Sequence, residues 1–144
     1  MKPLERTTLQ CIYCDDIRDE VGGKSTIVGW YGSDAPVALP SEGALVISSL
    51  GIIGILNLPP DSKYKSMKVE LLQNENVLQS VVMPEQTLNE IQLPVNQTPK
   101  PLFGREVRVA IKMSNLQIAE PCVLRMRVIV DDEEVYSNGL SFTR

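Results

Sequence analysis

Two stretches of the chain alternate between apolar and polar residues along most of their length. In 105–115 the apolar positions are Val107, Val109, Ile111 and Met113. In 122–131 they are Leu124, Met126, Val128 and Val130. A period of two places alternate side chains on opposite faces of a β-strand, whereas a helix would repeat every 3.6 residues. Both stretches are therefore predicted to be half-buried strands of an antiparallel sheet.

Further apolar runs, separated by turn residues, predict strands elsewhere in the chain. They cover 8–14, 25–31, 45–58, 67–72, 77–82, 87–93 and 140–143. The sequences QNEN at 73–76 and DDEE at 131–134 predict tight turns. Ten prolines and nine glycines interrupt the chain too often for long helices, which leaves room for one helical turn near 15–20 or 83–90.

Short strands at this spacing are typical of a β-sandwich. A chain of 144 residues suits one domain with one core. We therefore predict a single all-β domain over 1–144, an antiparallel sandwich of the immunoglobulin-like or C2-like type with eight to nine short strands.

The composition removes several classes of function. The chain contains no histidine, so Ser-His-Asp and Cys-His catalysis are excluded and the commonest metal ligand is missing. The formal net charge is −4, whereas most nucleic-acid-binding proteins carry an excess of positive charge on the binding surface. We expect a protein that is not an enzyme, carries no cofactor and does not bind nucleic acid.

The cysteines and the apolar runs bear on the compartment. Three cysteines are few and odd in number, which argues against the disulfide framework of a secreted protein. The first ten residues lack the apolar core of a signal peptide. The longest apolar run, 44–58, contains serines, glycines and an asparagine, and it is shorter than the roughly 20 residues of a membrane-spanning helix. We expect a cytoplasmic protein without membrane contact.

The stretch CDDIRDEVGGK, residues 14–24, gathers carboxylates, cations and glycines. Its acids Asp15, Asp16, Asp19 and Glu20 are candidates for Ca²⁺ or Mg²⁺ ligands, to which 131–133 would add a second acidic group. The spacing of an EF-hand is absent, and the interspersed cations favour ion pairing. The preferred prediction is a structural turn, made by Asp15, Asp16, Arg18, Gly22, Gly23 and Lys24.

Cys11 and Cys14 are three residues apart on a predicted strand. Positions i and i+3 of a strand face opposite sides, so the pair does not suit a metal or a redox centre. We predict buried structural thiols, because cysteine is among the most buried residue types.

Two surface features are candidates for partner binding. If the strands at 107–115 and 122–131 are sheet neighbours, four cations share one face: Arg108, Lys112, Arg125 and Arg127. The alternative is a solvated face whose cations pair with Glu70, Glu106 or Glu120. Trp30 and Tyr31 are adjacent on a strand, so one ring should point inward and the other outward, where it could contact a partner.

The motif at 14–32 resembles a family of small bacterial and phage proteins known as a domain of unknown function. The pattern is Cys-Asp-Asp-aliphatic-Arg-x-Glu-x-Gly-Gly-Lys, a short gap, then Gly-x-Tyr. It falls on Cys14, Asp15, Asp16, Ile17, Arg18, Glu20, Gly22, Gly23, Lys24, Gly29 and Tyr31. The resemblance implies a compact β-sandwich and no established activity, and it supplies no catalytic residues.

Together these observations predict a non-enzymatic protein-interaction module. The family resemblance alone implies a bacterial or phage origin, for example a phage accessory protein that binds a host or defence factor. Its expected contact surfaces are the end at Gly22 and Gly23, the Pro-rich loop at 98–103, and the sheet face with Arg125 and Arg127. An unpaired edge strand could also form a homodimer. The alternatives are a Ca²⁺-dependent C2-like module and a binder of an anionic ligand or nucleic acid through the basic face.

Overall fold

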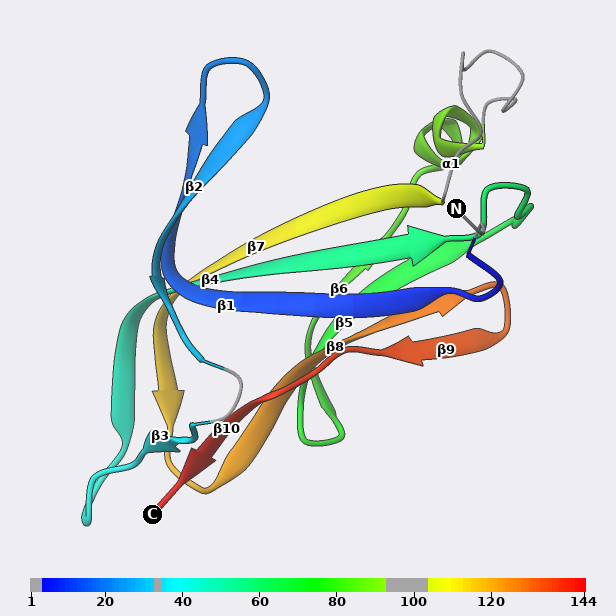
Figure 1. Cartoon of the computed structure of the whole chain (residues 1–144). Coiled ribbons are helices and arrows are strands. Elements are labelled where there is room, and N and C mark those ends of the chain that lie inside the picture. Colours follow the sequence, from blue (N-terminus) through cyan, green and yellow to red (C-terminus); the bar gives the residue numbers. More distant parts are fainter. Residues whose placement is uncertain (1–3, 33–34, 93–103) are drawn as a thin grey trace.

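A computed structural model of the chain describes residues 4–32, 35–92 and 104–144. Within these residues the chain forms ten strands and one short helix (Figure 1). In chain order they are β1 (Thr8–Glu20), β2 (Lys24–Trp30), β3 (Val37–Ala38), β4 (Leu45–Leu58), β5 (Met67–Gln73), β6 (Asn76–Val82), α1 (Glu85–Ile91), β7 (Arg105–Ile118), β8 (Cys122–Val130), β9 (Glu133–Tyr136) and β10 (Leu140–Thr143).

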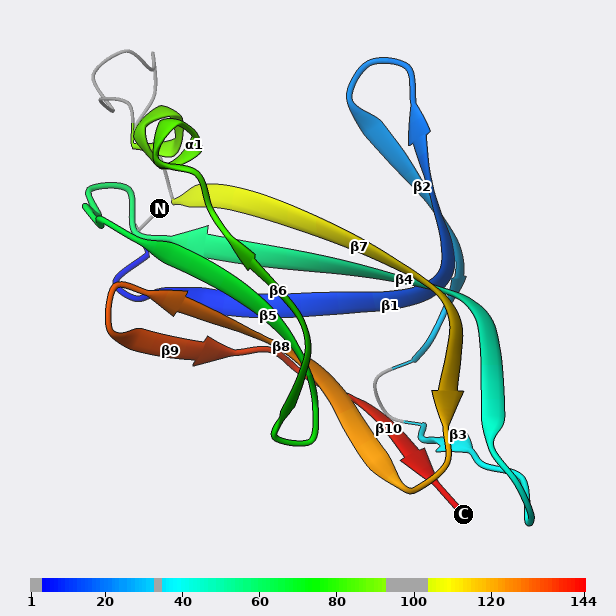
Figure 2. The same ribbon diagram turned by 180° about the vertical axis from the view of Figure 1, so that it is seen from behind.

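The strands form two sheets that pack face to face, which confirms the predicted all-β sandwich. One sheet, called sheet A below, has the order β2-β1-β4-β7. The other, sheet B, has the order β3-β10-β8-β5-β6, and β9 pairs with β8 beside β10. Figures 1 and 2 show the two layers from opposite sides. The assignment to an immunoglobulin-like or C2-like type stays a prediction.

Three details of the predicted strands were wrong. The short strands β3 and β9 raise the number of strands to ten, and the pair β3–β10 is parallel, not antiparallel. The run predicted as a strand from residue 87 is helix α1, where Leu88 is buried and Ile91 packs on the core, a spacing that matches a helical turn. The other stretch considered for a helical turn, 15–20, lies inside β1.

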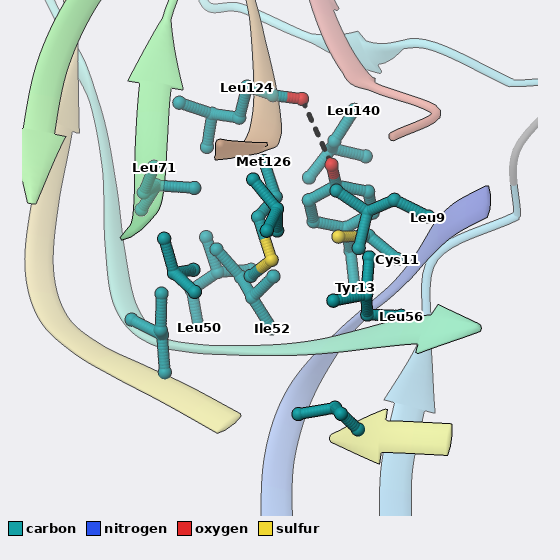
Figure 3. Close-up of a cluster of buried hydrophobic side chains, with 14 of the residues drawn as sticks. Leu9, Cys11, Tyr13, Leu50, Ile52, Leu56, Leu71, Leu124, Met126 and Leu140 are labelled. Carbon is teal, nitrogen blue, oxygen red and sulfur yellow. Dashed lines mark hydrogen bonds between the residues drawn. The ribbon is translucent and has the colours of Figure 1, made fainter. Parts of the chain in front are cut away.

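The core fills the space between the inner faces of the two sheets (Figure 3). It is lined by alternate residues of several strands, as their period of two requires, among them Leu9, Cys11 and Tyr13 of β1, Leu50, Ile52 and Leu56 of β4, and Leu124, Met126 and Val128 of β8. The Tyr13 hydroxyl reaches across the core and donates to the backbone oxygens of Leu124, at 3.2 Å, and Asn138, at 2.7 Å.

The two sheets approach each other closely where Gly54 of β4 faces Met126 of β8. A Cβ atom built on Gly54 would lie 2.3 Å from the Met126 sulfur, which is far inside van der Waals contact. Met126 is fully buried, so its side chain has little free space to move into. The absence of a side chain at residue 54 therefore sets how closely the sheets can pack.

A side chain joins the sheets at one edge of the sandwich. The Asn138 amide, between β9 and β10, accepts from the Cys11 N–H at 2.8 Å and donates to the Cys11 oxygen at 3.0 Å. These are the two bonds that a neighbouring strand would make to a residue of β1. Asn138 therefore covers part of the β1 edge that β4 leaves free.

Sheet A divides near residue 14. Before it, β1 pairs with β4, and from Cys14 to Glu20 it pairs with β2. The β1–β2 hairpin projects from the sandwich as an arm (Figure 1). At its base Ile17 folds onto the outer face of sheet A, where it packs with Cys14 and Ile53 in a second buried cluster. Gly51 makes room for it, since a Cβ there would lie 2.8 Å from the Ile17 side chain.

We expect Gly54→Ala to lower the free energy of unfolding by about 2 kcal/mol, because an added methyl group overpacks the core against Met126. Urea denaturation measures the change. The matched control is Gly32→Ala, since a Cβ at residue 32 meets no atom within 4 Å. In a Met126→Val background the Gly54→Ala change should cost less. An equal cost in both backgrounds would contradict the proposed contact.

Candidate functional site

The arm is a regular hairpin whose turn is shorter than the sequence predicted. β1 and β2 pair in one register from Cys14 with Trp30 to Glu20 with Lys24, so the turn consists of residues 21–23. Gly22 and Gly23 have φ values of 87° and 73°, as the glycine pair predicted.

The charged residues assigned to the turn lie in the strands instead. Asp15, Asp16 and Arg18 belong to β1, and Lys24 begins β2. The turn prediction was therefore wrong for these four residues. It failed because charged residues also fit a two-stranded ribbon that has solvent on both faces, so their presence does not mark a turn.

The acidic side chains of β1 form hydrogen bonds and an ion pair with other residues of the arm. An Asp16 carboxylate oxygen accepts the Ile17 N–H at 2.9 Å, and the other lies 3.5 Å from the Arg18 guanidinium. Glu20 accepts a hydrogen bond from the Thr26 hydroxyl at 3.0 Å. Along the strand, neighbouring acids such as Asp15 and Asp16 face opposite sides. Among the described residues, no three Asp, Glu or Cys side chains are grouped to hold a metal ion.

The second acidic group holds the backbone of a turn. An Asp131 carboxylate oxygen accepts the N–H groups of Lys65, at 2.8 Å, and Ser66, at 3.0 Å. These two bonds lower the pKa of Asp131. Asp131 itself has a φ of 52°, a conformation in which Asp is more frequent than most residues.

The base of the arm presents Trp30 to solvent. Its side chain is 71% exposed, whereas the adjacent Tyr31 is half-buried and packs on the core. The prediction that one ring points inward and the other outward is confirmed. Gly29 makes this arrangement possible, because it has a φ of 66° and a Cβ there would overlap the Asp15 carboxylate. Burial and the nearby Asp15 carboxylate raise the pKa of Tyr31.

A groove of about 430 Å³ lies beside Trp30. It is lined by residues 8–13 of β1, which include the free edge of that strand, by Asn57 of β4, and by residues 30–32 and 138–140. Because backbone groups alternate along a strand, the N–H and C=O of Leu9 point to the same edge as those of Cys11. The Asn138 side chain hydrogen-bonds to the N–H and C=O of Cys11. The N–H and C=O of Leu9 have no partner among the described residues. The sequence predicted one exposed ring at this place. It did not predict the groove, because the groove depends on the approach of residue 138, which is far away in the chain.

Cys11 and Cys14 lie on opposite faces of sheet A, as predicted. Cys11 packs in the core between the sheets, and Cys14 packs in the cluster under the arm. Both are free and buried, as is Cys122. Burial raises the pKa of the Cys11 and Cys14 thiols, and the nearby Asp15 charge adds to the effect on Cys14.

The predicted basic face does not form. Arg108 and Lys112 belong to β7 of sheet A, whereas Arg125 and Arg127 belong to β8 of sheet B, so the four cations share no surface. The alternation of the two strands was correctly predicted, but alternation does not reveal which strands are neighbours. β7 pairs with β4, and β8 pairs with β5, β9 and β10.

The arginines of β8 are held by neighbours on the outer face of sheet B. Arg127 lies 2.7 Å from Glu70, the only charged residue that is buried among those described. Arg127 also donates to the Tyr136 hydroxyl, and bonds to Tyr136 and Glu70 raise its pKa. Arg125 stacks on the Tyr136 ring at 4.4 Å.

The alternative of a paired face is therefore confirmed for Glu70 with Arg127 and for Glu106 with Arg108. The Pro-rich loop at 98–103 lies outside the described residues. Within those residues, no helix has the length and apolar character needed to cross a bilayer.

Comparison with known proteins yields no match, whether to protein-family models, to curated proteins or to solved structures.

We expect Arg127→Met to lower the free energy of unfolding by about 3 kcal/mol, because it leaves the Glu70 carboxylate buried without its main partner. The second change Glu70→Gln should recover part of the loss in that background. Thermal or urea denaturation of the single and the double variant measures both effects. Arg108→Met is the control, since its ion pair with Glu106 is exposed and should contribute less than about 1 kcal/mol. Equal losses in the two arginine variants would contradict the buried pair.

We expect the cysteines to resist thiol reagents while the chain is folded. At pH 8 burial and raised pKa values keep Cys11 and Cys14 as buried thiols, so they should react with Ellman's reagent at least about tenfold more slowly than in urea. All three cysteines should react at once after unfolding. Fast reaction of the native protein would contradict the burial of these thiols.

Proposed function

We propose that the chain is a non-enzymatic protein-interaction module, and that the groove beside Trp30 is its main contact surface. The observation that carries the proposal is the exposure of Trp30 at the mouth of a groove. Tryptophan is the residue most enriched at the energetic centres of protein interfaces, and a large exposed ring gains much by burial.

The partner that fits this groove is an extended segment of another protein. The Leu9 N–H and C=O can bond to the backbone of such a segment, and the Trp30 ring can cover one of its apolar side chains. The arm adds contact area above the groove, since every residue of β2 is exposed. The absence of histidine supports a binding role over catalysis.

The biological setting is proposed from the sequence. The resemblance of residues 14–31 to the bacterial and phage family supports an accessory protein that binds a host or defence factor. Three free cysteines support a reducing compartment such as the cytoplasm. The immunoglobulin-like or C2-like type of sandwich is also proposed from the sequence, as the family resemblance is.

We expect Trp30→Ala to weaken binding to the partner by at least about tenfold, as a central interface tryptophan does. The partner is first recovered by affinity purification with the wild-type chain, and its affinity is then measured by calorimetry with purified components. Val46→Ala is the control, because Val46 is an exposed apolar residue of β4 outside the groove.

Hydrogen exchange gives an independent readout at the backbone. The Leu9 amide should become protected when the partner is bound, whereas amides at the tip of the arm should change less. A partner whose affinity is unaffected by Trp30→Ala would overturn the groove as the contact surface. Recovery of a bound small molecule and no protein would overturn the proposed function itself.

A further inference from the structure

The edge strand of sheet B has an exposed apolar surface. β6 pairs only with β5 among the described strands, and all seven of its residues are exposed. Four of them are large apolar side chains: Val77, Leu78, Val81 and Val82. Val82 is 67% exposed. An unpaired strand of this composition is a template for another strand.

The other described edges carry features that discourage pairing. The outer face of β7 has Glu106, Arg108 and Lys112 in alternate positions, and charges on an edge oppose strand addition. The β1 edge is covered in part by Asn138. β2 contains Lys24 and the left-handed Gly29, and β3 has only two residues. β6 has no charged residue and no proline.

The backbone of β6 shows which groups are open. The Met67 oxygen accepts from the Met83 N–H, and Val69 pairs with Val81 in the same register. The N–H and C=O of Val81 therefore point toward β5, and those of Ser80 and Val82 point away from it. Pro84 lacks an N–H, which limits any added pairing to the residues before it.

We propose that β6 pairs antiparallel with β6 of a second copy of this chain, around a two-fold axis at Val81. In this register Ser80 faces Val82 of the second copy, and each such pair exchanges both of its N–H···O bonds. The contact is isologous, as in most homodimers, because the same strand serves both copies. It joins the two copies of sheet B into one continuous sheet.

A second copy fits this edge because the symmetric register continues the apolar pattern of the core. Val69 is buried, and its cross-strand neighbour Val81 lies on the same face of the sheet. The axis places Val81 against Val81 of the second copy, which makes a row of four valines across the interface. The Val81 pair is not hydrogen-bonded across the axis, and such pairs bring side chains closest. β6 also offers no charge with which to select a foreign strand.

Sedimentation velocity of the full chain over a range of concentrations tests the proposal, which does not depend on the groove at Trp30. We expect a reversible monomer–dimer equilibrium. Val81→Lys should weaken the dimer by at least about tenfold, because it places like charges opposite each other at the axis. Val46→Lys is the matched control, since it adds the same charge at a similarly exposed strand valine outside β6.

Hydrogen exchange of the wild-type chain supplies a test that does not depend on a variant. The Ser80 and Val82 amides should become protected as the concentration rises, while the Leu9 amide should not. A chain that stays monomeric up to millimolar concentration overturns the proposal. So does a dimer that Val81→Lys and Val46→Lys weaken equally, or one in which the Ser80 amide stays unprotected.

Discussion

The structure depends on the contact of Ile17 and Cys14 with Gly51, because this contact determines where β1 leaves the sandwich. Up to residue 14, β1 is a core strand whose inner face carries Leu9 and Tyr13. Beyond it the strand would continue along β4, but Ile17 instead packs over the bare backbone of Gly51. The same strand thus closes the core with one half and forms the arm with the other. Trp30 and its groove lie at the point of division.

The sequence predicted which residues are buried better than it predicted which strands are neighbours. The period of two correctly placed Met126 in the core and Arg127 on the outer face, since that choice depends only on the strand itself. Strand order depends on the three-dimensional path of the connections, which no local pattern encodes. The predicted basic face required β7 and β8 to be adjacent, and it was wrong for that reason.

The candidate site shows the same division between local and distant information. An exposed ring at Trp30 could be predicted, because adjacent residues of a strand face opposite sides. The groove could not, since it needs Asn138 to approach Cys11 across the sandwich. The buried Glu70 was named as one of three partners for the basic residues, but its burial beneath Arg127 follows only from the pairing of β5 with β8.

The two proposed contact surfaces lie on opposite edges of the molecule, and this separation has a consequence for binding. Asn138 ties the groove edge of β1 to the β9–β10 end of sheet B, whereas β6 is the strand at the other end of that sheet. Pairing through β6 would therefore leave both copies of the groove open. A partner with two binding segments would then meet two grooves on one particle, and its second segment would bind at a high effective concentration. Modest affinity at each groove would be sufficient for stable capture, provided that the linker between the segments spans the dimer.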